Sequence, residues 1–63
     1  MQEIKIEGYW DSEKNGIALY DCLKKKLGLP EDMYVYAKKS NFKIYNLYDS
    51  DDRLLYCPEI LID

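Results

Sequence analysis

Hydrophobic and polar residues alternate at the start of the chain, and this alternation predicts the first strand. Within residues 2–10, QEIKIEGYW, Ile4 and Ile6 alternate with charged side chains. A period of two is typical of a strand that buries one of its faces. Gly8 falls in phase with the isoleucines, which indicates a bulge or a close approach of another backbone. The turn-forming run 11–16, DSEKNG, predicts that the strand ends there.

The spacing of apolar residues then changes from two to about four, which predicts a helix. Leu19, Leu23 and Leu27 recur every four residues and would share one face of a helix over about residues 15–27. We expect Asn15, or a serine in the turn before it, to cap the N-terminus. This helix is the longest element that the pattern predicts.

The end of the predicted helix carries three further signals. Gly28 supplies the left-handed residue of a C-terminal cap, Leu29 can fold back on Leu23, and Pro30 prevents continuation. The three lysines 24–26 suit the negative end of the helix dipole. Successive helical positions point about 100° apart, so we interpret these lysines as capping charges and not as one phosphate-binding patch.

Alternation returns in the second half of the chain and predicts a group of strands. Residues 33–38 and 42–48 alternate, and the short connection 39–41 makes them an antiparallel pair. A fourth strand is expected over 53–57, and the apolar tail 59–63 is a candidate further edge strand. The predicted order is therefore β-α-β-β-β.

These elements predict a small α+β protein with a single domain, residues 1–63, and no linker. One helix, about 15–27, packs on one face of a three- to five-stranded mixed or antiparallel sheet. A helix between the first two strands permits a right-handed crossover, which would make those strands parallel if they share a sheet. A helix about 10 Å across covers about half of one face of a sheet with four strands.

Strand alternation also assigns side chains to two faces. One phase holds small, branched or apolar residues that we expect in the core: Ile4, Ile6, Val35, Ala37, Phe42 and Ile44. The other phase combines tyrosines with lysines and is expected to face outward: Lys5, Glu7, Tyr9, Tyr34, Tyr36, Lys38, Lys43, Tyr45 and Leu47. The outward face is therefore predicted to be an open surface of tyrosines framed by lysines.

Charge and size limit the function classes. The chain has 63 residues, 12 acidic and 9 basic, for a net charge of −3, which disfavours non-specific nucleic-acid binding. No apolar run approaches the roughly 20 residues that span a bilayer, so we expect no membrane association. A domain this small buries only about 60 % of its unfolded surface, which favours a homo-oligomer or another partner.

Candidate catalytic and metal-binding residues are scarce. The chain has no histidine to act as a general base, and its two cysteines lie 35 positions apart in patterned segments. With no signal peptide recognised, we expect free thiols in a cytoplasmic protein. The sequence predicts no enzyme activity, no cofactor and no metal site.

The acidic run 49–52, DSDD, begins like a calcium-binding loop. An EF-hand needs Gly at its sixth position and Glu at its twelfth, where this chain has Leu54 and Ile60. A solvated turn explains the run better. An acidic binding face is the alternative, and it would join the run to acidic residues of other loops: Asp11, Glu13, Glu31 and Asp32.

The tyrosine-rich outward face leaves three explanations. Tyrosine favours strands and tolerates partial exposure, it is enriched in protein interfaces, and its ring can stack on single-stranded nucleic acid. We expect stoichiometric binding of a protein partner, as an inhibitor or regulator of the kind that phages and mobile elements encode. A single-stranded nucleic-acid-binding module is the alternative. The predicted contact residues are Tyr9, Tyr34, Tyr36, Lys38, Lys43 and Tyr45.

Overall fold

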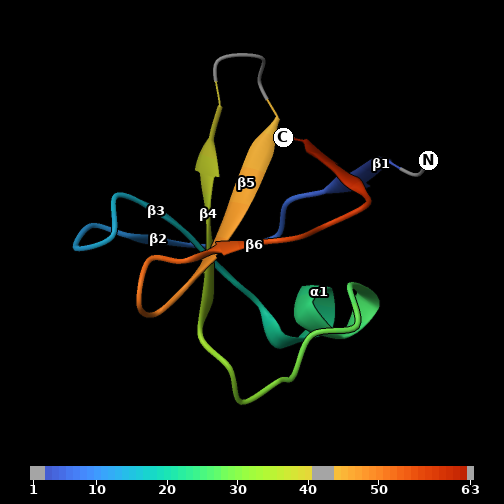
Figure 1. Cartoon of the computed structure of the whole chain (residues 1–63), viewed down its shortest axis with the longest axis horizontal. Coiled ribbons are helices and arrows are strands. Elements are labelled where there is room, and N and C mark those ends of the chain that lie inside the picture. The colour runs from blue at the N-terminus through green and yellow to red at the C-terminus, as the bar shows by residue number, and fades with distance from the viewer. Residues whose placement is uncertain (1–2, 41–43, 63) are drawn as a thin grey trace.

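The computed structural model describes residues 3–40 and 44–62, and in these ranges the chain forms seven short strands and one α-helix. Figure 1 shows α1 on one side of the crossing strands and the hairpin of β2 and β3 on the other. The elements are β1 (Glu3–Lys5), β2 (Gly8–Asp11), β3 (Gly16–Leu19), α1 (Asp21–Lys26), β4 (Val35–Lys39), β5 (Tyr45–Asp49), β6 (Leu54–Leu55) and β7 (Ile60–Ile62).

Two sheets organise the described residues. The large sheet has the order β2-β3-β4-β5-β6, and every neighbouring pair in it is antiparallel. The small sheet pairs β1 with β7 in parallel, so the two ends of the described chain lie side by side (Figure 1). The predicted α+β class, with one helix and a mixed or antiparallel sheet, is confirmed. The tail after Pro58 does form a strand, as expected.

The predicted bounds of the helix are wrong, because its first third is a strand. Residues 16–19 form β3, and α1 covers only Asp21–Lys26. Leu19 and Leu23 do share one core, but they reach it from a strand and from a helix. The four-residue spacing was therefore a coincidence of two elements. Neither Asn15 nor Ser12 caps α1, whose N-cap is Tyr20 without a side-chain hydrogen bond.

Gly16 shows why this segment suits a strand inside the large sheet. A Cβ at Gly16 would lie 2.7 Å from the carbonyl oxygen of Ala37 on β4 and 3.0 Å from the ring of Tyr36. Ala18, also on β3, lies opposite Tyr36 and is buried. Small residues on β3 thus allow β4 and its tyrosine to approach closely.

The C-terminal end of α1 agrees with the prediction. Gly28 has a φ of +74°, and its amide donates to the carbonyl of Lys25. The amide of Leu29 donates to the carbonyl of Lys24 at 2.8 Å, which completes a Schellman motif. The ammonium group of Lys24 also donates to the carbonyls of Glu31 and Met33, so the loop after the helix is held against it.

The first predicted strand is two strands in different sheets. β1 belongs to the small sheet and β2 to the large one. A Cβ at Gly8 would overlap the carbonyl oxygen of Ala18, which confirms the close backbone approach that the sequence indicated. β2 and β4, which correspond to the first two predicted strands of the large sheet, run in the same direction, as expected, because each is antiparallel to β3 between them. The connection between them is not the simple helical crossover that was expected, since β3 precedes the helix and lies between the two strands.

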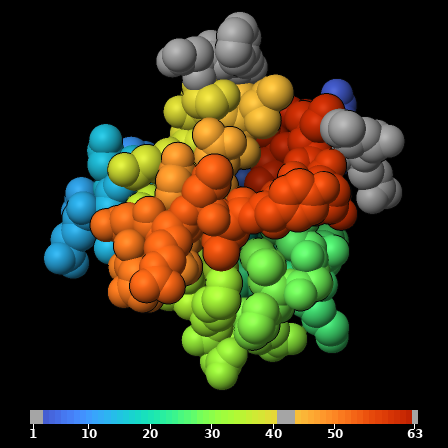
Figure 2. All heavy atoms as spheres, in the orientation of Figure 1, coloured from blue at the N-terminus to red at the C-terminus, as the bar shows by residue number. Residues whose placement is uncertain are grey.

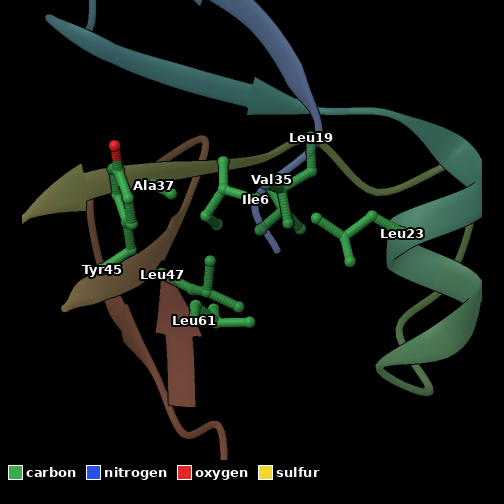
Figure 3. Close-up of a cluster of buried hydrophobic side chains, with 8 residues drawn as sticks. All are labelled: Ile6, Leu19, Leu23, Val35, Ala37, Tyr45, Leu47 and Leu61. Atoms are coloured by element: carbon green, nitrogen blue, oxygen red, sulfur yellow. The ribbon is translucent and has the colours of Figure 1, made fainter. Parts of the chain in front are cut away.

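The core lies between the large sheet, α1 and β7. Side chains from β3, β4 and β5 point toward Leu23 of α1 and Leu61 of β7, both fully buried (Figure 3). Tyr45 and Leu47 belong to this core, although the sequence assigned them to the outward face. Conversely, Ile44 is exposed. Phe42 lies outside the described residues.

Strand register explains this correction. Ala37 on β4 lies opposite Leu47 on β5, and Lys39 lies opposite Tyr45. Residues directly opposite each other share a face, so the core side of β4 determines the core side of β5. Alternation within one strand cannot supply this relation, because it depends on the length of the turn between the strands.

Candidate functional site

The face of the large sheet opposite the core carries the candidate site, which we call the tyrosine face. Its aromatic side chains come from β2, β4 and β5 and from the residue just before β4. Its charged side chains come from β2, from β4 and from two turns. The tyrosine face comprises Tyr9, Tyr34, Tyr36, Tyr48, Asp11, Lys14, Lys38 and Asp52.

Three of the tyrosine rings form a continuous row. The ring centroids of Tyr34 and Tyr36 are 6.1 Å apart, and those of Tyr36 and Tyr48 are 5.4 Å apart with a stacked geometry. Such offset pairs add stabilisation beyond burial alone. Tyr36, in the middle of the row, is only 1 % exposed. It therefore acts as a second, smaller packing centre on this face.

Carboxylates accept hydrogen bonds from two of the three hydroxyl groups of this row. Tyr34 donates to Asp11, and Tyr36 donates to Asp52. The hydrogen bond to Asp52, followed by desolvation, raises the pKa of Tyr36 to about 12, whereas burial and the bond to Asp11 raise the pKa of Tyr34. The same hydrogen bonds are the main reason that the pKa values of both aspartates lie below their ordinary range. Both carboxylates are thus ionised at neutral pH.

Lysines complete the network over the rings. Lys14 forms an ion pair with Asp52 at 3.2 Å and donates to the carbonyl of Ser50 at 3.0 Å. Its ammonium nitrogen lies 5.7 Å from the ring centroid of Tyr36, and that of Lys38 lies 5.8 Å from the same ring. These distances suit cation–π attraction. Positive and negative groups are therefore mixed on the tyrosine face.

The structure brings four of the predicted contact residues together and separates the others. Tyr9, Tyr34, Tyr36 and Lys38 lie on the tyrosine face, but Tyr36 is buried and offers no free surface. Tyr45 lies on the opposite face, in the core, with the ammonium nitrogen of Lys39 6.0 Å from its ring centroid. Lys43 lies outside the described residues.

Sequence reasoning missed two exposed aromatic residues beside Tyr9. Trp10 is 61 % exposed and Tyr20 is 49 % exposed. The rings of Tyr9 and Tyr20 are 6.2 Å apart, and Trp10 lies next to Tyr9 on the other face of β2. We call Tyr9, Trp10 and Tyr20 the aromatic edge. In Figure 2 the hairpin of β2 and β3, in blue, projects from the body of the molecule.

A groove accompanies Trp10 on the core side of the large sheet. It has a volume of about 330 Å³, and its walls include Trp10, Ile17, Ala37 and Tyr45. Helix α1 has only six residues and packs through Leu23 against the other end of the sheet. It therefore does not cover this end. The sequence does contain a signal for this exposure. Strand alternation places Trp10 on the core side of the sheet, which one helix could only half cover.

No group of three or more metal-ligating side chains forms in residues 3–40 and 44–62. Helix α1 spans about two turns, and no helix in the described part of the chain has the length and apolar character to cross a bilayer. Comparisons with protein families, curated proteins and solved structures found no match to this chain.

Proposed function

We propose that this protein works without catalysis, by stoichiometric binding of a protein partner through the aromatic edge. The observation that supports this most strongly is the grouping of Tyr9, Trp10 and Tyr20 at the terminal strand of the large sheet, each about half or more exposed. Tyrosine and tryptophan are enriched among the residues that carry binding energy in protein interfaces. An inhibitory or regulatory role of the phage-encoded kind, in the cytoplasm, belongs to the same proposal.

The tyrosine face favours a protein partner over single-stranded nucleic acid. Stacking of bases needs free ring faces next to cations. Here the ring of Tyr36 is covered by Tyr48 and by lysines, and the ionised carboxylates of Asp11 and Asp52 stand among them. Phosphates would be repelled by these carboxylates, whereas a protein surface of mixed charge can match them.

Capture from an extract of the native host tests the proposal. The variant Tyr9→Ser/Trp10→Ser should capture at most about one tenth as much of the specific partner as the unmodified protein, because loss of one tyrosine or tryptophan that acts as an interface hot spot costs about 2 kcal/mol or more. Tyr56→Ser is the matched control, since Tyr56 is 87 % exposed but follows β6, at the opposite edge of the large sheet. Equal capture by all three proteins would contradict the proposal.

The nucleic-acid alternative has its own measurement. Fluorescence anisotropy with labelled single-stranded oligonucleotides should show no binding at an ionic strength of about 50 mM, where phosphate contacts are strongest. Micromolar affinity that disappears at high salt, together with loss of that affinity in Trp10→Ser, would instead support a nucleic-acid module.

A further inference from the structure

The outer edge of β2 exposes main-chain hydrogen-bonding groups. β2 is the terminal strand of the large sheet, and no described strand pairs with its outer side. The amide of Tyr20 donates to the carbonyl of Glu7, and pairing continues from there with Tyr9 opposite Ala18. Because hydrogen-bonded and non-hydrogen-bonded pairs alternate in antiparallel strands, the amides and carbonyls of Gly8 and Trp10 point away from β3.

This edge lacks the lysines and prolines that commonly protect edge strands against strand addition. Natural edge strands carry lysines, prolines or bulges that prevent pairing with another chain. β2 reads Gly-Tyr-Trp-Asp and has neither a lysine nor a proline. Tyr9 projects on one face of the strand and Trp10 on the other, so an added strand would gain aromatic contacts on both of its faces.

The acidic side chains along β2 and in the turn after it favour one kind of occupant, since Lys14 in that turn is paired with Asp52. The lysines near Trp10 lie on β4, on the inner side of the strand, and they are Lys38 and Lys39. Glu7 precedes the strand, Asp11 ends it, and Glu13 follows in the turn, where its side chain is exposed. In a two-fold pairing of β2 with a second copy centred on Tyr9, Glu7 of each chain would lie opposite Asp11 of the other. Like charges directly opposite each other are destabilising. A second copy is therefore disfavoured, and a strand with basic ends is favoured.

We infer that the outer edge of β2 accepts an extended segment of a partner protein, with Lys or Arg at its ends and apolar or β-branched residues between them, as an added strand of the large sheet. This inference rests on the proposed function and names the partner's binding mode. The main chain of Gly8 and Trp10 provides the hydrogen bonds, and the acids at the ends of β2 fix the register.

Amide hydrogen exchange measured by NMR tests whether the edge is open. In the free protein the amides of Gly8 and Trp10 should exchange rapidly, whereas those of Tyr9 and Asp11, which face β3, should be at least about tenfold slower. Slow exchange at Gly8 and Trp10 in dilute, free protein would overturn the inference, because it would mean that the edge is already covered.

A peptide library identifies the occupant. Synthetic hexapeptides with Lys at both ends and Val, Ile, Thr or Tyr at the four central positions are compared with the same library carrying Glu at both ends. The Lys-ended library should be retained about three- to tenfold better, and Glu7→Gln/Glu13→Gln should remove most of this preference. Glu31→Gln/Asp32→Asn is the control, because these exposed acids lie after α1. Equal retention of the two libraries would overturn the inference.

A pair of substitutions at one position separates strand addition from aromatic contact. Trp10→Ala and Trp10→Pro both lose the ring, but only proline removes the outward amide, and an edge strand tolerates proline when that amide faces solvent. Retention of the Lys-ended peptides should be lower for Trp10→Pro than for Trp10→Ala, with thermal melts confirming that both are folded. Equal retention by the two folded variants would overturn strand addition.

Outcomes for this inference and for the proposed function can be told apart. If capture of the native partner depends on Tyr9 and Trp10 while no peptide protects the amide of Gly8, the proposed function stands and strand addition fails. If peptides protect Gly8 but native capture is unchanged in Tyr9→Ser/Trp10→Ser, strand addition stands and the proposed function fails.

Discussion

Tyr36 shows how much of a residue's role depends on its neighbours. Alternation places it on the face opposite the core, and this prediction is confirmed by its pairing with Ala18 and Tyr48. It is buried all the same, because Tyr48 stacks on it, Lys14 and Lys38 lie near its ring, and Asp52 binds its hydroxyl. The identity of these neighbours depends on register and turns, which alternation alone does not supply.

The tyrosine hydroxyls predict a loss of stability at alkaline pH. Tyr36 has a pKa of about 12 in the folded protein and an ordinary value near 10. Because the pKa of Tyr36 is higher in the folded protein than its ordinary value, the protonated hydroxyl stabilises the fold fully at pH values below the ordinary pKa. This stabilisation is lost as the pH rises through the pKa of the folded protein. The free energy of unfolding should therefore fall between pH 10 and about 12.

Urea unfolding at a series of pH values checks this prediction. Tyr36→Phe should reduce the pH-dependent part of the loss, because it removes the titrating hydroxyl. Tyr56→Phe is the control, since Tyr56 is exposed and should leave the profile unchanged. A Tyr36→Phe profile identical to that of the unmodified protein would contradict the role assigned to this hydroxyl.

At the scale of elements, α1 is held by one face and by its C-terminal cap. Leu23 is the fully buried residue of α1, and it contacts a core built from four strands around it (Figure 3). A helix of six residues has little stability by itself, so tertiary packing must hold it.

The variant Leu23→Ala should lower the free energy of unfolding by about 2–5 kcal/mol, because it removes buried volume in a site that cannot collapse fully. For a domain this small, that loss is comparable to the total stability. Cys22→Ala, at the exposed neighbouring position, should change it by less than about 0.5 kcal/mol. Equal effects of the two substitutions in urea unfolding would contradict the packing described for α1.

The elements differ in how well the sequence predicts them. The antiparallel pairing of β4 and β5, the turn before β6 and the C-terminal cap of α1 follow from local signals and are confirmed. The predicted connection over 39–41 is wrong at its start, because Lys39 belongs to β4 and pairs with Tyr45, and the rest of it lies mostly outside the described residues. The strand over residues 16–19 does not follow from local signals. Leu19 continues the spacing of the helical leucines, whereas its neighbours pack as a strand. Here tertiary contacts with β2 and β4 override the periodic signal.

The candidate site was predictable in the same partial way. Tyr9, Tyr34 and Lys38 follow from alternation, and the structure places them on one face. Exposure of Trp10 follows only in part: its phase places it on the half-covered face, but which part of that face stays open depends on how far the short helix reaches over the sheet. The burial of Tyr45 depends on the register across the turn of its hairpin.

At the scale of the whole molecule, the protein has little interior and much surface. Its principal extents are 28 × 25 × 19 Å, and in the described residues a small hydrophobic core lies on one face of the large sheet and the packing around Tyr36 on the other. The shortness of α1 leaves the groove beside Trp10 open, and Lys38 and Lys39 form part of its lining. A homo-oligomer, expected from this small core, stays a prediction and would use a surface other than the outer edge of β2.

Site-specific photo-crosslinking in the native host tests the central claim most directly. A photoreactive phenylalanine analogue at position 10 should join the protein to one partner protein, and the same analogue at position 56 should not, although both side chains are exposed. Crosslinks of similar yield from both positions, crosslinks to nucleic acid, or crosslinks from position 10 only to a second copy of this chain would contradict the account.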